Sequence, residues 1–379
     1  MRKIFIYFFV FLCSFCLSTE SFAHPLKNSP SPKWRIAYVE GGPYSEYQST
    51  FMAILKGFMQ QNILKKTALP PVNSFADSRE IWNWAVQNTQ SDIIEFIPDG
   101  FYSANWDSEQ RIEQKKTVLK RINEQNDIDI ILAFGTFGGS DFATDEHDVP
   151  TFVMSVTDYV QAKIIVSPQD SGRDHVHASV ETGRYERQLA TFFDVFHFKK
   201  LGIPFDDSED GKATIALTQL ENAAKKLGFE IELCGFNTLE SKDKVVDNLI
   251  SCLEDLGRRS DAIYMTMNTA MQRDRMTDIL EPVINAGLPT FSQLGVDETE
   301  LGVLMSLSQP SFDNEGLNTV NAIIETINGK LPRECEQEYS GPLGLAINLK
   351  MAMLIGWNPP FEILAAVDNI FHEIRNDTK

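Results

Sequence analysis

Two threonines, Thr136 and Thr157, stand where their hydroxyl groups could bind a polar ligand. Each follows one of two short apolar runs, Ile128–Phe134 and Thr151–Val156, which are rich in Ile, Val, Leu and Phe. Such runs predict strands that are buried on both faces. A glycine-rich turn and a segment of helical length separate the runs, as in a βαβ unit. Ligands of such sheets bind at the carboxyl ends of the strands, so we expect the turns after both strands to line a small-molecule site.

Side chains of a different character follow two later apolar runs. Asp206 comes after Lys200–Phe205, and Asn268 comes after Asp261–Met267. Hydroxyl and backbone N–H donors suit a carboxylate, whereas an acidic side chain suits an amino group. The hypothesis is therefore a small zwitterionic or polar ligand, with an amino acid as one example. The alternative is that both threonines only cap helices and turns.

Other chemistry is only weakly indicated. His147 beside Asp148, and His175-x-His177, suggest a metal site, but no third ligand is identifiable. We predict neither a metal nor a cofactor. Ser140 follows two glycines, but it lacks the G-x-S-x-G pattern of a hydrolase nucleophile and is expected to begin a helix. The glycine spacing of the same turn does not match a dinucleotide fingerprint.

The elements that position these residues alternate between strand and helix along the chain. The fold class is therefore α/β, with two doubly wound Rossmann-like lobes and a ligand cleft between them. The predicted strands are 35–39, 93–97, 128–134, 151–156, 200–205, 229–234, 261–267, 289–292 and 301–307, and the predicted helices are 47–61, 78–87, 108–123, 183–196, 212–227, 242–256, 273–285 and 314–328. The aromatic residues Phe101, Tyr102 and Trp106 either belong to the core or reach the cleft.

The N-terminus has the features of a secretory signal peptide. A basic start precedes an apolar run, Ile4–Leu17, and small residues flank Phe22 in Ser21-Phe22-Ala23. We expect cleavage before His24 and a periplasmic mature protein. The alternative is an uncleaved anchor, although the run is shorter than the about 20 residues of a membrane span.

The composition limits the partners and the disulfides. The chain of 379 residues has a formal net charge of −19, which argues against nucleic acid and anionic membranes as main partners. Three cysteines, Cys234, Cys252 and Cys335, follow the signal peptide. They are either three free thiols or a Cys234–Cys252 bridge with one thiol left over.

Four segments in order resemble the substrate-binding proteins of ABC importers with the type I periplasmic-binding-protein fold. The resemblance covers most of residues 34–370 and is closest to the branch that binds tryptophan or tyrosine. Its segments are Val156-Thr157-Asp158 with Ala162, Tyr185–Val195 with Lys199–Ile203, LENAAKKLGF at 220–229, and Ala346–Met353 with Leu354-Ile355-Gly356. Tyr159 stands where the family usually has Pro, Asp174–His177 replaces a common Asn-Val-Thr-Gly stretch, and the turn after 205 is unusually acidic. The ligand therefore need not be an aromatic amino acid.

The resemblance also implies a site, a domain division and a function. Lobe one would comprise 33–160 plus 303–332, and lobe two 161–302 plus 333–379, with hinge segments near 158–163, 297–301 and 331–339. The function implied is a monomeric periplasmic receptor, not an enzyme, that delivers its ligand to an ABC permease. The alternatives are the ligand-binding component of a sensor system and an exported hydrolase. The implied ligand-binding residues lie at strand ends and are Gly42, Tyr44, Glu46, Thr136, Phe137, Ser155, Thr157, Asp158, Asp206, Asn268, Thr269, Gln293 and Asp297.

Overall fold

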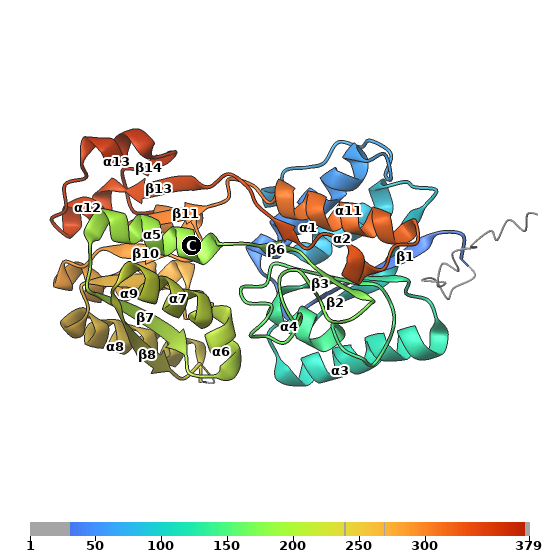
Figure 1. Ribbon diagram of the computed structural model, residues 1–379, viewed down its shortest axis with the longest axis horizontal. Helices are drawn as coiled ribbons and strands as arrows, with labels where there is room; N and C mark the ends of the chain where they lie inside the picture. The colour runs from blue at the N-terminus through green and yellow to red at the C-terminus, as the bar shows by residue number, and fades with distance from the viewer. Residues whose placement is uncertain (1–30, 239, 269, 376–379) are drawn as a thin grey trace, which may run out of the picture.

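The computed structural model describes residues 31–238, 240–268 and 270–375 of the chain. It has two α/β lobes side by side, joined by chain segments that cross between them (Figure 1). Lobe one is built on a five-stranded sheet and lobe two on a seven-stranded sheet. The predicted fold class is confirmed. The signal-peptide prediction falls on residues 1–23, which lie outside the described residues. Within the described ranges, no helix has the length and apolar character needed to cross a membrane.

Lobe one is a parallel sheet in the order β2-β1-β3-β4-β5, covered by helices on both faces. Alternate residues of a buried strand face opposite helical layers. Thus Tyr38 packs in the core under the helices at 45–60, 78–88 and 313–327, whereas Val39 packs in the core under the helices at 108–120 and 135–142. The elements are β1 (Trp34–Glu40), α1 (Ser45–Gln60), α2 (Ser78–Asn88), β2 (Ile94–Ser103), α3 (Ser108–Lys120), β3 (Ile130–Phe134), α4 (Gly135–Phe142), β4 (Thr151–Met154), β5 (Val176–Ala178) and α11 (Asp313–Ile327).

Lobe two is a sheet in the order β14-β13-β11-β10-β9-β7-β8, in which β13 and β14 are parallel to each other and antiparallel to the other five strands. One continuous apolar core fills this lobe. Its elements are α5 (Arg184–Phe196), β7 (Lys200–Asp206), α6 (Glu209–Thr214), α7 (Leu217–Leu227), β8 (Glu230–Phe236), α8 (Lys242–Arg259), β9 (Ala262–Met265), α9 (Met276–Ala286), β10 (Thr290–Ser292), α10 (Val296–Glu300), β11 (Met305–Ser308), β13 (Gly344–Asn348), α12 (Leu349–Leu354), α13 (Phe361–Ala366) and β14 (Asn369–Phe371).

The chain crosses between the lobes at other places than those expected. β5 pairs with β4 and keeps residues up to 178 in lobe one, although we placed the boundary at 160. β11 pairs with β10 and β13 in lobe two, although we assigned residues from 303 to lobe one. The crossings follow β5, β11 and the short strand β12 (Glu338–Tyr339), which pairs with β6 (Val180–Glu181). A short apolar run has the same pattern in either sheet, so its pairing partner is decided only in the folded chain.

Two of the expected hinge segments are therefore displaced. Residues 158–163 form a turn within lobe one, and residues 297–301 belong mainly to α10, which packs in lobe two. The third, 331–339, ends in β12 beside the last crossing. The segments that join the lobes, where a hinge would lie, are thus the paired β6 and β12 together with residues 309–312.

Two elements differ from those expected from the sequence, and each difference has a local cause. The helix expected over 212–227 is interrupted at Ala216, whose φ of 56° is left-handed, so two helices form. β2 continues past Pro98 through an irregularity in its pairing with β1, which places Phe101 in the core, stacked on Tyr38. Cys234 and Cys252 form a disulfide, and Cys335 is a buried free thiol.

Candidate functional site

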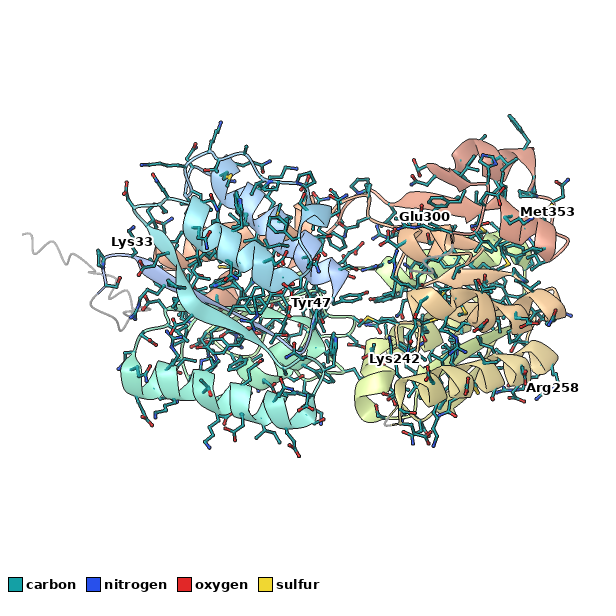
Figure 2. The ribbon with its side chains drawn as sticks, turned by 180° about the vertical axis from the view of Figure 1, so that it is seen from behind. Lys33, Tyr47, Lys242, Arg258, Glu300 and Met353 are labelled. Carbon is teal, nitrogen blue, oxygen red and sulfur yellow. A yellow bond between two sulfur atoms is a disulfide. The ribbon has the colours of Figure 1, made fainter. Side chains whose placement is uncertain are left out.

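The carboxyl ends of the strands in both lobes face the cleft. Figure 2 shows Lys33, just before β1, at the outer end of lobe one, and Tyr47, early in α1, at the end that faces lobe two. In lobe two, Lys242 at the start of α8 faces the cleft, and Arg258 near its end lies outside. Because β1 and β8 both run toward the cleft, the turns that follow them are brought opposite one another, as the sheet geometry predicts.

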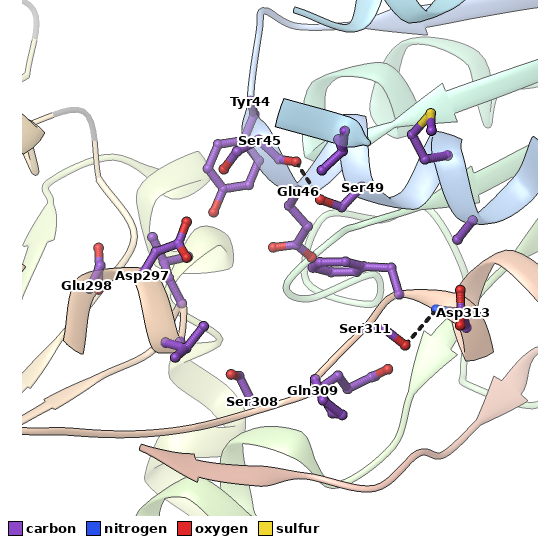
Figure 3. A pocket seen from close by; sticks show the side chains of 18 of the residues that line it. Tyr44, Ser45, Glu46, Ser49, Asp297, Glu298, Ser308, Gln309, Ser311 and Asp313 are labelled. Atoms are coloured by element: carbon purple, nitrogen blue, oxygen red, sulfur yellow. Dashed lines mark hydrogen bonds between the residues drawn. The ribbon is translucent and has the colours of Figure 1, made fainter. Parts of the chain in front are cut away.

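A cavity of about 850 Å³ lies between the lobes beside the hinge. The start of α1 lines it from lobe one, and α10 lines it from lobe two (Figure 3). Tyr44, Glu46 and Asp297 project into it from these two sides, and the crossing from Ser308 to Asp313 forms its floor in this view. The cavity is therefore bounded by both lobes and by one of the segments that join them.

Arg184 is the charged centre of this interface. Its Nη1 lies 4.0 Å from Oε1 of Glu46 in lobe one and 3.9 Å from Oε2 of Glu181 in β6. Nη2 donates to the carbonyl of Leu294 at 3.3 Å, and the buried Nε has no hydrogen-bond partner among the described residues. Burial raises the pKa of Glu46, and the Arg184 charge opposes that rise. Arg184 is therefore an incompletely bonded cation between two carboxylates.

Glu315 organises the turn after β4 from a distant part of the chain. This first-turn residue of α11 accepts hydrogen bonds from the Ser155 N–H at 2.7 Å and the Thr50 hydroxyl at 2.8 Å. Burial raises its pKa to about 7, and the nearby Glu46 charge adds to the rise. Ser155 adopts a left-handed φ of 55°, a conformation that a non-glycine residue keeps only when its surroundings hold it there.

A second hollow, of about 410 Å³, lies elsewhere between the lobes. Trp106 and Phe137 line it from lobe one, and Asp206 and Asp207 line it from lobe two. Of the three aromatic residues that follow the expected strand 93–97, only Trp106 reaches the cleft. Phe101 is buried, and the Tyr102 hydroxyl accepts a hydrogen bond from Arg121.

The structure brings most of the expected site residues to the inter-lobe space. Tyr44, Glu46 and Asp297 line the large cavity, and Ser155, Thr157 and Gln293 lie with Tyr44 and Arg184 in a narrow adjoining space. Phe137 and Asp206 line the second hollow, and Gly42 lies under the Trp106 indole.

Four expected residues have other positions or local partners. Thr136 lies on α4 and lines neither hollow. The Asp158 carboxylate accepts from two N–H groups of its own turn. The Asn268 side chain also bonds within its own turn, where its amide group donates to the Thr266 carbonyl and its amide oxygen accepts from the Ala270 N–H. Gln293 borders the narrow space but also accepts from the Met267 N–H. Thr269 lies outside the described residues.

Sequence reasoning missed Arg184, Glu181 and Glu315, and it also missed Tyr339, which lines the large cavity from β12. Glu181 ends the short strand β6 and Arg184 begins the next helix, so the strand-end rule would have found both if β6 had been recognised. Glu315 has no such signal, because its partners Thr50 and Ser155 are far away in sequence.

The histidine cluster does not assemble into a metal centre. The rings of His147 and His175 are 5.2 Å apart, and burial lowers the pKa of both. Within residues 31–238, 240–268 and 270–375, no three His, Cys, Asp or Glu side chains are placed to hold a metal ion.

Comparison with known proteins supports the fold through structure alone. No protein-family model matches the chain, and no curated protein matches it. An ABC domain in complex with L-Trp from Streptococcus pneumonia is 16% identical, with a TM-score of 0.65 over 89% of this chain and 100% of that one. The ligand-free, open structure of a substrate-binding protein with adhesive properties from Clostridium difficile is 15% identical, with a TM-score of 0.60 over 90% and 100%. A type 1 periplasmic binding protein from Bordetella pertussis is 11% identical, with a TM-score of 0.50 over 80% and 86%.

These similarities confirm the type I periplasmic-binding-protein fold that the sequence segments suggested. The two lobes, the three crossings between them and the cleft at the carboxyl ends of the strands are consistent with this fold.

Proposed function

We propose that this chain is a periplasmic substrate-binding protein that captures a small polar ligand by lobe closure and delivers it to an ABC importer. The observation that carries the proposal is the convergence of opposite charges from both lobes on a cavity next to the hinge: Glu46 from lobe one and Arg184 from lobe two. A ligand that satisfies both groups links the lobes and thereby favours the closed state.

An amino acid is the ligand class that we favour. Its carboxylate would accept from Arg184, whose buried Nε has no partner in the described part of the chain, and from the hydroxyls of Ser155 and Thr157. Its amino group would bind Glu46. The role requires binding and release without turnover, and therefore neither catalysis nor a cofactor. In the same proposal the protein is a monomeric receptor, and its partner is a permease. Export would depend on cleavage before His24.

The test begins with protein produced with its export signal. N-terminal sequencing should give His24, and native mass spectrometry should show a small molecule bound with one-to-one stoichiometry. The twenty L-amino acids are then tested by calorimetry and by thermal shift. A ligand at 100 times its Kd should stabilise the protein by about 2.7 kcal/mol, and small-angle scattering should show contraction of the particle.

Two variants locate the site, and one controls for loss of charge. Arg184→Gln and Glu46→Gln should each weaken binding about tenfold or more, since removing a buried polar partner costs about 1–3 kcal/mol. Arg258→Gln, at an exposed position on α8, should bind as the wild type does. If none of the twenty produces a binding signal, the amino-acid class is wrong; if in addition no small molecule co-purifies and no organic cation or sugar binds, the proposal fails. If a ligand binds equally well to all three variants, the site is wrong.

A further inference from the structure

The second hollow contains an aromatic surface that the proposed function does not use. Trp106 and Phe137 meet edge to face there, with ring centroids 6.1 Å apart. Trp106 is 44% exposed, although a tryptophan side chain usually buries its large apolar ring. Exposed aromatic rings that line a concave surface are a common feature of ligand sites.

The backbone holds Trp106 in this position. Its φ is 63°, and the preceding Asn105 also has a left-handed φ, of 52°. The Trp106 N–H donates to the Gly41 carbonyl at 2.8 Å, and the indole Nε1 donates to the Pro43 carbonyl at 3.3 Å. Gly42 lies against one side of the indole, because an added Cβ would be only 2.6 Å from three ring atoms. The exposed area of the ring is therefore on its other side and edge, and the ring is fixed before any ligand arrives.

The electrostatic character of the hollow is acidic. Asp206 and Asp207 line it from lobe two, and neither forms an ion pair within the described ranges. The Asp206 carboxylate accepts only a neutral partner, the Thr238 hydroxyl at 2.7 Å. The one cation in the lining, Arg111, is already neutralised by a two-point ion pair with Asp141, at 2.8 and 3.0 Å.

One aromatic ring of the surface already binds a cation. The Arg111 guanidinium lies 4.2 Å from the centroid of Phe137, well inside the roughly 6 Å range of a cation–π interaction. A second cation on the open side of Trp106 would have the indole on one side and the Asp206 and Asp207 carboxylates across the cleft. A neutral sugar could also stack on the indole, but it would leave these two negative charges without a counter-charge.

We infer that this hollow binds an organic cation, held between the Trp106 indole in lobe one and Asp206 and Asp207 in lobe two. This inference rests on the proposed function and adds to it a second site in the same cleft, for molecules that carry an alkylammonium or guanidinium group. The cation would join the lobes at a second place. When the lobes close, the Asp206 and Asp207 carboxylates would approach the bound cation on the aromatic surface of Trp106.

The experiment compares cations with a neutral molecule of the same shape. Calorimetry and tryptophan fluorescence would be measured with choline, putrescine and L-arginine, and with 3,3-dimethyl-1-butanol, the uncharged analogue of choline, and D-glucose. At least one cation should bind saturably and change the tryptophan emission, whereas the two neutral molecules should not. Trp106→Leu and Asp207→Asn should each weaken binding of that cation at least tenfold.

Two matched variants control for the loss of an aromatic ring and of an acid. Phe361→Leu removes an aromatic side chain that is 79% exposed on α13, and Asp243→Asn neutralises an exposed acid on α8. Both should leave cation affinity unchanged. If an amino acid without a cationic side chain, or D-glucose, binds while all three cations fail, the cation inference is wrong and the proposed function stands. If cations bind but Trp106→Leu has no effect, the assigned hollow is wrong. If nothing binds and nothing co-purifies, both proposals fail.

Discussion

Replacing Glu315 by glutamine should change how the stability of the protein depends on pH. Glu315 is 2% exposed and accepts hydrogen bonds from the Ser155 N–H and the Thr50 hydroxyl. The glutamine carbonyl can accept from the same N–H, and its amide group can donate to the hydroxyl oxygen. The variant therefore keeps the shape and most of the bonding of the protonated acid, but it does not titrate.

The size and sign of the effect follow from the raised pKa. Burial raises the Glu315 pKa from 4.5 to about 7, which corresponds to about 3 kcal/mol at roughly 1.4 kcal/mol per pH unit. The folded state holds the proton more tightly than the unfolded chain, so this stability is fully present below pH 4.5. It is lost as the pH rises through about 7. The free energy of unfolding of Glu315→Gln should therefore improve relative to wild type by up to about 3 kcal/mol between pH 4.5 and 8.

The assay is urea denaturation of both proteins at several pH values in that range, followed by circular dichroism. Burial also raises the pKa of Glu40 and Glu298 to about 7, but these two carboxyls titrate in both proteins and cancel in the difference. A difference between variant and wild type that stays constant from pH 4.5 to 8 would falsify the argument, because it would mean that Glu315 ionises in the folded state as it does in water.

Three further perturbations test other parts of the structure. Burial lowers the pKa of His177 to about 4, so its contribution to stability is present above about pH 6.5 and lost as the pH falls toward 4; urea midpoints should fall more steeply in wild type than in His177→Gln, and parallel curves would contradict this. Gly135→Ala should lower the free energy of unfolding by at least about 1 kcal/mol in a melting experiment, because φ is +71° and the added Cβ would overlap the Tyr47 hydroxyl; an unchanged melting temperature would show that the turn can relax. Replacing Cys234 and Cys252 together by alanine should cost about 3 kcal/mol for a loop of this length, and denaturation of the double variant with and without reductant should give the same midpoint, whereas a reductant effect that persists would point to another bridge.

The sequence alone determined the fold class and the edge of the sheets at which ligands bind. Both depend on patterns within a short stretch of chain: an apolar run such as Ile130–Phe134, then a glycine turn, then a helix. Because parallel strands bring all their carboxyl ends to one edge, the turns containing Tyr44, Glu46 and Thr157 could be placed at the cleft before their partners were known.

Only the tertiary structure decided which lobe receives each short strand and which distant side chains complete the site. β11 has the same apolar pattern in either sheet, so the point at which the chain crosses depended on its pairing with β13. Glu315 bonds to Ser155 across 160 positions of sequence, and Arg184 comes within 4.0 Å of Glu46 from the other lobe. Periodicity reports the face that a residue presents within its own element. It carries no information about which element packs opposite, and this is why the contact between Arg184 and Glu46 across the cleft emerged only from the folded chain.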